Sequence, residues 1–340
     1  MARAQTAPVM TTPDSASPIV GLVGYGVTGR SIGAQLLDLK IRVAVFDPAL
    51  TVASRGAIEV GDASDLAVTD AIALCHPHPH AQLAEEYLAA GVSVVSMSAD
   101  ISDVRALVDL DDLARQRGAA LIVGAAMSPG LTGLLADHLW RQLDVAEEIH
   151  IATHGTAGPA CAVQHHDALG ETAIGWHDGQ WIERPGGSGR ELDWFPEPIK
   201  AKDCYRAAMP DPFLLHRMFP SASRISARVS GTRRDRLTAR LPMLPPPHAA
   251  GDVGAVRVEV RGAAQDGARV TVIAGAAGPT SHLAAAVTVA CLESCLVGQL
   301  APGVHLVGGA SLDPPALLRR VVELGVRLQE YTGVARATAW

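Results

Sequence analysis

Short apolar runs alternate with longer amphipathic segments over the first part of the chain. Buried strands are predicted at 19–24, 42–46, 71–75, 92–96 and 119–125, with a weaker one at 57–60. Apolar positions recur at helical spacing over 30–39, 80–90, 101–118 and 131–143. Because parallel strands need crossover helices, this alternation predicts an α/β fold that begins with a doubly wound parallel sheet.

The pattern changes after about residue 146. Apolar and polar side chains then alternate, as in half-buried strands, over 148–154, 223–230, 254–262 and 268–275. The last two segments should pair, and residues 173–185 should form a hairpin that turns at Asp178-Gly179. Only two long helices are predicted beyond this point, over 281–300 and 315–331. The second part is therefore predicted to be an α+β domain with a mostly antiparallel sheet.

A glycine-rich motif, Gly24-x-Gly26-x-x-Gly29, lies between the first predicted strand and its helix. In this context the glycines permit a tight turn, close approach of a pyrophosphate and close helix packing, while the helix N-terminus donates N–H groups to phosphates. The alternative is an ordinary turn. We predict that the motif binds a dinucleotide through Gly24, Tyr25, Gly26, Val27, Thr28 and Gly29.

Asp47 ends the second predicted strand, 18 residues past Gly29. A carboxylate at this position accepts hydrogen bonds from ribose hydroxyls and repels a 2′-phosphate, which favours NAD over NADP. NADP stays possible because Arg55 is near in sequence. The alternative for Asp47 is a solvent-facing strand end.

Four segments are expected from these patterns. They are a disordered tail at 1–17, a Rossmann dinucleotide-binding domain at 18–146, an α+β substrate or dimerisation domain at 147–300, and a C-terminal helix and tail at 301–340.

The crevice beyond the carboxyl ends of parallel strands is where such sheets bind ligands. Segments 75–80, 96–100 and 126–130 follow the fourth, fifth and sixth predicted strands. Asp100 is also placed to cap the next helix. From these segments we expect His76, Pro77 and Ser96 to border the cofactor, and Ser98 and Pro129 to border the substrate.

The sequence CHPHPH at 75–80 has the composition of a metal site. Pro77 and Pro79 cannot join a strand ladder, and each disfavours helical geometry in the histidine before it. The three histidines should therefore point in different directions, and we predict no metal site. We place His76 beside the cofactor's ribose and nicotinamide, and His80 in solvent.

Histidines and arginines of the second part supply further candidates. We predict a catalytic group of His154, His165 and His166, with His165 or His166 as the acid/base, since histidine titrates near working pH. The His165-His166 pair could instead cap a helix or lie on its surface. Arg234, in the run 233–236, is either part of a solvated turn or an anchor for a substrate carboxylate. Packing roles are favoured for Tyr205 and Arg206.

Composition excludes several other classes of function. The chain of 340 residues carries 28 basic and 35 acidic side chains, a net charge of −7, which argues against non-specific nucleic-acid binding. The five cysteines have no Cys-x-x-Cys spacing, and no apolar run reaches the length of a membrane span. We expect a cytoplasmic protein with a small-molecule substrate and no nucleic-acid or membrane partner. The helix predicted at 281–300 is apolar on most sides, so it lies either in the centre of the core or at a subunit interface, and we expect a homodimer.

Two further motifs point to a family. SPGL at 128–131, after the sixth strand, and GPTSHLAAAVTVACLESCLVGQLAPGV at 278–304 resemble the saccharopine dehydrogenase-like oxidoreductases, over roughly residues 19–330. The resemblance implies NAD(P)-linked chemistry on a C–N bond of an amino acid, opine or imine. It also implies a lysine and a histidine as acid/base groups, but Lys40, Lys200 and Lys202 lie outside the predicted crevice segments.

Two functions therefore remain open. The first is an NAD(P)-dependent oxidoreductase that transfers a hydride to or from a small amino or imino acid, or a related CH–OH substrate. The second is a non-catalytic dinucleotide-binding sensor or partner subunit, which the missing lysine motivates.

Overall fold

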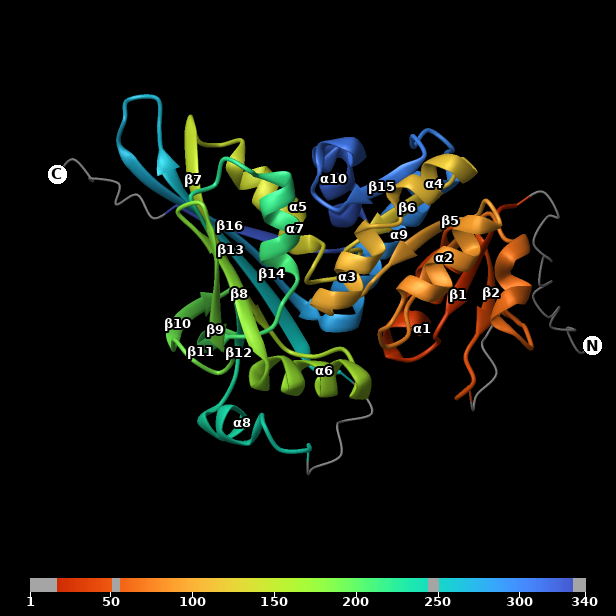
Figure 1. Cartoon of the computed structure of the whole chain (residues 1–340), viewed down its shortest axis with the longest axis horizontal. Coiled ribbons are helices and arrows are strands. Elements are labelled where there is room, and N and C mark those ends of the chain that lie inside the picture. Colours follow the sequence, from red (N-terminus) through yellow and green to blue (C-terminus); the bar gives the residue numbers. More distant parts are fainter. Residues whose placement is uncertain (1–16, 51–55, 244–250, 333–340) are drawn as a thin grey trace, which may run out of the picture.

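The structure, a computed structural model, describes residues 17–50, 56–243 and 251–332. Figure 1 shows two sheets that stand side by side with helices packed between them. Within the described residues, no helix has the length and apolar character that crossing a bilayer would require. The predicted tail, apart from residue 17, and Arg55 lie outside the described residues.

The first sheet has seven strands, all parallel, in the order β15-β6-β5-β4-β1-β2-β3. The chain winds outward in both directions from β1 and β4, so the switch point lies between these strands. The predicted doubly wound sheet is confirmed. Its strands are β1 (Ile19–Val23), β2 (Arg42–Phe46), β3 (Ile58–Glu59), β4 (Ala71–Leu74), β5 (Ser93–Ser96), β6 (Ala120–Val123) and β15 (Gly303–Leu306).

Helices cover both faces of this sheet, which is why its strands are apolar on both sides. One face packs against α2 (Ala81–Ala89), α3 (Ile101–Val108) and α4 (Asp111–Arg117). The other packs against α1 (Val27–Asp38) and α9 (Thr280–Leu296), which contact each other. A short helix, η1 (Ala63–Val68), precedes β4.

The single helix predicted over 101–118 is wrong, because the chain breaks between α3 and α4. The break lets α4 pack against β15, where Oδ1 of Asp111 accepts the backbone N–H of Val304 at 2.7 Å. Gly118 ends α4 in a left-handed conformation with φ of 68°.

The second sheet is mostly antiparallel, as predicted, and among the described strands only the β7–β12 pair is parallel. The predicted hairpin and the β13–β14 pairing are confirmed, with positive φ at Asp178 and Gly179 in the hairpin turn. The strands are β7 (Val145–His154), β8 (Thr172–His177), β9 (Gln180–Pro185), β10 (Glu191–Phe195), β11 (Lys200–Arg206), β12 (Arg224–Ser230), β13 (Val253–Ala263), β14 (Arg269–Pro279) and β16 (Leu328–Thr332).

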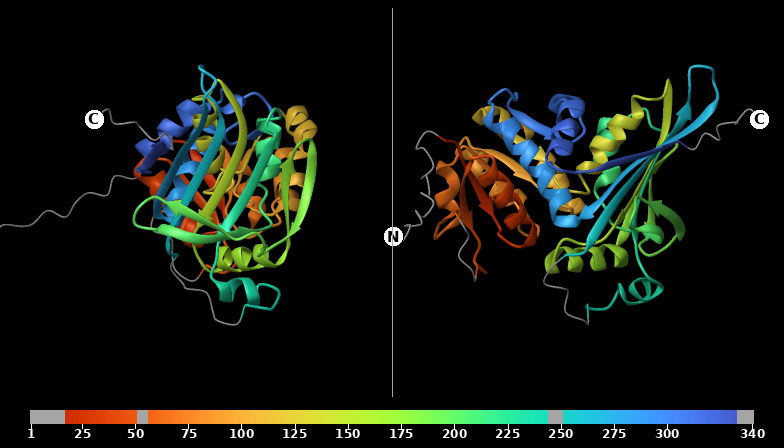
Figure 2. Two further views of the ribbon diagram at one scale, coloured as in Figure 1. Left: turned by 90° about the vertical axis from the view of Figure 1, so that its left-hand side faces the viewer. Right: turned by 180° about the vertical axis from the view of Figure 1, so that it is seen from behind.

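The two faces of this sheet differ. The inner face carries apolar residues such as Ile151, Val229 and Val258, and packs against α5 (Leu131–Trp140). The outer face carries polar residues such as Ser226, Arg228 and Arg257, together with a small apolar cluster that includes Ala152 and Cys204. Figure 2, left, shows the middle strands from this side with no helix in front of them. The remaining helices are α6 (Pro159–Gly170), α7 (Asp211–Met218), α8 (Arg233–Thr238), η2 (Ala310–Leu312) and α10 (Pro314–Glu323).

The helix predicted over 315–331 is too long. It ends at Glu323, and Gly325 follows with φ of 99°, a conformation that interrupts a helix. Residues 328–332 then form β16 on the edge of the second sheet, while β15 has already joined the first. The chain thus crosses between the sheets more than once, and the domain boundaries after residues 146 and 300 stay predictions.

Candidate functional site

The glycine loop between β1 and α1 is shaped by two close backbone contacts. Gly24 has φ of 93°, and a Cβ there would lie 2.7 Å from the backbone nitrogen of His76. A Cβ on Gly29 would lie 2.3 Å from the carbonyl oxygen of Gly24. Both positions therefore require glycine. The missing side chain at Gly24 lets the start of the loop lie against the segment after β4.

Gly26 lies in a more open place than Gly24 and Gly29. It is the N-cap of α1, and a Cβ added there would meet no atom of the described residues within 4 Å. No side chain caps the helix and its first turn holds no acidic residue. The N–H groups of the first turn therefore face an open space that suits an anion such as a pyrophosphate.

Asp47 lies beside this loop at the end of β2. Its Oδ2 accepts the backbone N–H of Tyr25 at 2.6 Å, and its Oδ1 accepts that of Ala49 at 2.8 Å. Each carboxylate oxygen keeps a lone pair for a further donor, such as a ribose hydroxyl. The Tyr25 ring is buried under α1 next to Gly33, so only the backbone of Tyr25 can contact a ligand at the loop.

The segment after β4 differs from its prediction at one histidine. His80 is only 1% exposed, so its predicted place in solvent is wrong. Its Nε2 donates to the carbonyl of His76 at 2.8 Å, and its Nδ1 accepts from the Ser96 hydroxyl at 2.8 Å. Burial and the proximity of His76 lower the pKa of His80 to about 4. A neutral His80 therefore braces the crevice wall.

His76 stacks on His80 with ring centroids 4.5 Å apart, and its backbone lies against Gly24, so the structure brings it to the glycine loop. Its Nδ1 is buried and has no hydrogen-bond partner among the described residues. Asp103, at the start of α3, accepts the N–H groups of His80 and Ala81 at 2.9 Å and so caps α2. In the part of the chain that the structure describes, no three His, Cys, Asp or Glu side chains are grouped to hold a metal ion.

Helix α6 extends from the second sheet to the crevice and contacts it at two points. Its N-cap, Gly158, packs so closely on Val27 of the glycine loop that a Cβ would lie 2.7 Å from Val27 Cγ2. Further along, Gln164 Nε2 lies 2.9 Å from His78 Nδ1. Because the amide donates to Nδ1, the remaining nitrogen of His78 carries the ring proton.

The charge of His78 acts on two carboxylates, Asp100 and Glu171. Burial raises the pKa of Glu171, and the charges of Asp100 and Asp167 raise it further, while His78 opposes the shift. Asp100 also caps α3 by accepting the N–H of Asp103 at 2.8 Å, as its sequence position suggested. These three residues, Asp100 before α3 with Asp167 and Glu171 at the end of α6, are called the acidic cluster.

Of the histidines predicted as catalytic, His154 ends β7, whereas His165 and His166 lie on α6, directly after Gln164. His165 Nε2 donates to the carbonyl of Ser230 at 2.9 Å, and His154 Nδ1 lies 2.6 Å from the Ser230 hydroxyl. His166 Nε2 donates to the carbonyl of Leu241 at 2.8 Å. Burial, followed by nearby Lys202, lowers the pKa of His154 to about 4. Their catalytic role stays a prediction.

The residues predicted to border the cofactor or substrate are mixed in exposure. Ser96 and Ser98 are buried, and the Ser98 hydroxyl accepts the N–H of Asp100 at 3.5 Å. Pro77 is exposed, and Thr28 is half-buried in the first turn of α1. Ligand contacts for all four stay predictions.

Pro129 is fixed by its surroundings. Its carbonyl accepts the N–H of Ala126 at 2.9 Å. The adjacent Ser128 donates to buried Asp211 at 2.9 Å, and Thr132 donates to the same carboxylate at 2.6 Å. Asp211 belongs to α7, so this contact joins the crevice wall to the second part of the chain.

Arg234 is not brought to these residues. It is exposed on α8, a short helix with a capping box from Thr232 and Asp235. The turn predicted for 233–236 is therefore a helix. In Figure 1, α8 lies below α6 on the side away from the first sheet.

Sequence reasoning missed His78, Gln164, Glu171 and Asp211 as residues of the crevice. His78 belongs to the CHPHPH segment, but the sequence favours His76, which is nearer to the end of the fourth strand. The others depend on α6 and α7, and neither helix was predicted. The Gly158-Pro159 step, with proline at the first helical position, was the available signal for α6.

Comparisons with known proteins bear on the fold. No protein-family model matches the chain, and no curated protein matches its sequence. Among solved structures, apo saccharopine dehydrogenase (L-Glu forming) from Saccharomyces cerevisiae is 14% identical with a TM-score of 0.72, covering 94% of this chain and 100% of that one. A meso-DAPDH mutant from Clostridium tetani E88, solved with DAP, is 15% identical with a TM-score of 0.50, covering 86% and 94%. The chain therefore has the two-domain fold of saccharopine dehydrogenase, as its glycine loop and late apolar helix had indicated.

Proposed function

We propose that the protein is an NAD(P)-dependent oxidoreductase that acts on a small amine- or imine-bearing substrate. The observation that carries the proposal is the uncapped N-terminus of α1, open at Gly26, with Asp47 beside it. The likeness in fold to saccharopine dehydrogenase supports it as an analogy.

The residues present fit a dinucleotide. The first turn of α1 offers N–H groups to the pyrophosphate, and Asp47 offers carboxylate lone pairs to the adenosine ribose. The negative charge of Asp47 favours NAD, and NADP stays the alternative. When bound, the nicotinamide would supply the hydride chemistry, while the chain binds, orients and moves protons.

His78 is the histidine best placed to move a proton in the crevice. It is exposed, its Nδ1 is held by Gln164, and its other ring nitrogen is the one left to exchange a proton. By contrast, His165 and His166 each donate to a backbone carbonyl. We therefore favour His78 as the acid/base over the predicted pair.

The acidic cluster supports an amine-bearing substrate. Burial is the main cause that raises the pKa of Glu171, and the charges of Asp100 and Asp167 raise it further. Such a group attracts an ammonium or iminium cation and repels a free carboxylate. The cluster therefore favours a substrate that is oxidised or reduced at a C–N bond over one that reacts at a CH–OH group.

The experiment that tests the proposal has two parts. NADH and NADPH are titrated by fluorescence, and turnover is then measured with a panel of amino acids and of keto acids plus ammonia. Nucleotide binding together with turnover supports the oxidoreductase. Nucleotide binding without turnover of any pair would favour the second candidate, a sensor or partner subunit. The homodimer and the cytoplasmic location stay predictions.

A further inference from the structure

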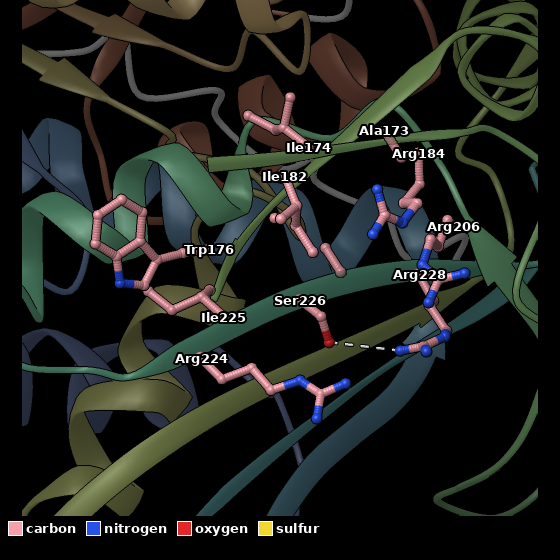
Figure 3. Close-up of a pocket in the computed structure, with 12 residues that line it drawn as sticks. Ala173, Ile174, Trp176, Ile182, Arg184, Arg206, Arg224, Ile225, Ser226 and Arg228 are labelled. Carbon is pink, nitrogen blue, oxygen red and sulfur yellow. Dashed lines mark hydrogen bonds between the residues drawn. The ribbon is translucent and has the colours of Figure 1, made fainter. Parts of the chain in front are cut away.

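Two strands, β8 and β11, pair with the same edge of β12. β8 pairs with it at Arg224 and Ile225, whereas β11 pairs with it from Arg228 onward. Between these pairings, Ser226 and Ala227 have no ladder partner on that edge among the described residues. The two neighbours diverge there and leave a pocket, which Figure 3 shows from close by.

Four arginines line this pocket. Arg224 and Arg228 are alternate residues of β12 and share one face with Ser226, because side chains repeat every second residue in a strand. Arg206 lies directly opposite Arg228 in the register, so it points to the same face. Arg184 reaches the pocket from β9. In Figure 3, Arg184, Arg206 and Arg228 lie toward one end, with Arg224 beyond Ser226.

This arginine pocket is separate from the dinucleotide crevice. Ile225 and Val229, which alternate with the arginines along β12, point into the core that faces the first sheet. The arginines therefore lie on the outer face of the second sheet. The two sites also differ in charge, because the crevice is bordered by the acidic cluster.

The positive charge of the pocket is mostly unpaired. Arg228 forms an ion pair with Glu191 at 2.7 Å, and Arg184 donates to the backbone carbonyl of Glu183 at 2.9 Å. The side chains of Arg206 and Arg224 form no hydrogen bond or ion pair with any described residue, although the charge of Glu191 acts on Arg206 and the charge of Arg224 acts on Glu148. Burial lowers the pKa of Arg206, and the charges of Arg228, Arg184 and Arg224 lower it further. Half-buried guanidinium groups that repel one another are stabilised when an anion lies between them.

The size of the pocket limits its ligand. The cavity is about 40 Å³, and a water needs roughly 10–15 Å³ on the same scale. It therefore holds a phosphate or carboxylate group and not a nucleotide. Ile182 shares the face of β9 with Arg184, lines another part of the pocket and can contact a short carbon chain.

We propose that the arginine pocket binds a small oxyanion with more than one negative charge, either a phosphate group or a dicarboxylate. Guanidinium groups bind both through paired N–H donors, and four of them exceed what a single carboxylate would neutralise. The site is independent of the proposed oxidoreductase activity, since it uses none of the crevice residues.

Calorimetric titration of the full chain tests this proposal, with inorganic phosphate, pyrophosphate and malonate as separate probes. The test variant is the double substitution Arg206→Gln and Arg224→Gln, the two arginines without partners. Arg319→Gln, on the exposed side of α10, is the matched control for loss of one positive charge. Gly26→Ser is the control for phosphate that binds at the glycine loop instead.

The expected result is binding of at least one probe to the wild type, with Kd raised about tenfold or more in the double variant. Arg319→Gln should leave Kd unchanged. Gly26→Ser removes binding of phosphate or pyrophosphate at the glycine loop, and the binding that remains should be the part that the double variant loses. The preferred probe distinguishes the phosphate source from the dicarboxylate source. The proposal is overturned if no probe binds the wild type at millimolar concentration, or if the double variant binds as well as the wild type.

Thermal stability gives a second readout should the double variant be hard to interpret. Each single substitution, Arg206→Gln or Arg224→Gln, should keep or raise Tm without an anion, because it removes repulsion and breaks no ion pair. Phosphate should raise the Tm of the wild type more than that of either variant. A lowered Tm for both single variants, with the same phosphate response as the wild type, would show a structural role and contradict the proposal.

Discussion

The backbone N–H of Tyr25 donates a 2.6 Å hydrogen bond to Oδ2 of Asp47, which ties the glycine loop to the end of β2. The other oxygen of this carboxylate holds the N–H of Ala49. Asp47 thus fixes the shape of the loop and keeps its charge beside the proposed dinucleotide site. Under the proposed function, this one residue contributes both to the shape of the loop and to the choice between NAD and NADP.

Asp47→Asn should therefore weaken NADH binding and reduce the preference against NADPH. The amide turns an N–H group toward one of the two backbone donors, so we expect the free energy of unfolding to fall by about 1 kcal/mol. Fluorescence titrations with both nucleotides and urea denaturation measure the two effects. Asp70→Asn is the matched control, because Asp70 accepts the backbone N–H of Ile19 at 2.7 Å at the other end of β1. Equal NADH affinity in both variants would count against a cofactor role for Asp47.

His80 should make the protein less stable in mild acid. Its pKa falls to about 4 in the folded protein, from about 6.5 in an unfolded chain. As the pH falls through this range, the unfolded state binds a proton at this histidine and the folded state does not. The free energy of unfolding therefore falls, by up to about 3 kcal/mol.

The check is urea denaturation at several pH values for the wild type and His80→Gln. The amide of glutamine does not titrate, so the variant should lose less stability on acidification. Other buried histidines, such as His154, contribute equally to both proteins and cancel in the comparison. A difference in unfolding free energy that stays constant from neutral to acid pH would refute the role assigned to His80.

Asp211 should be a strong determinant of stability at the junction of the two parts. Its buried carboxylate accepts hydrogen bonds from both Ser128 and Thr132. Asp211→Ala leaves two hydroxyl groups without their acceptor, and we expect a loss of about 2–4 kcal/mol by urea denaturation. Asp266→Ala, at an exposed turn where the carboxylate accepts only the N–H of Ala268, should cost far less. Equal losses would mean that the Asp211 contacts do not hold the junction.

His78→Gln should lower kcat by about a hundredfold or more while leaving the Kd for NADH unchanged, if His78 moves the proton in turnover. His138→Gln, on the exposed surface of α5, is the control and should keep full activity. Stopped-flow and steady-state assays with the best substrate from the panel separate the two parameters. Full activity in His78→Gln would return the acid/base role to His154, His165 or His166.

Periodicity and motif context predicted most of what positions the site. The strand at each apolar run, the glycine loop and the position of Asp47 could be predicted from local sequence, since strand burial and tight turns depend on nearby residues. His80 was misplaced because its burial depends on Asp103 and Ser96, which reach it from other elements. The acidic cluster and the arginine pocket depend on how α6, β8 and β11 meet distant strands, and no local pattern encodes such contacts.

Gly26→Ser tests the central claim most directly. Serine is a favoured N-cap, so the variant should keep its Tm, while its side chain fills the open space and takes an N–H group from the phosphates. Gly61→Ser, at another position where a Cβ meets no described atom, is the matched control. NADH or NADPH should bind the wild type and Gly61→Ser in a fluorescence titration, and should bind Gly26→Ser at least about tenfold more weakly. Failure of both nucleotides to bind the wild type at millimolar concentration, or unchanged affinity in Gly26→Ser, would contradict the account.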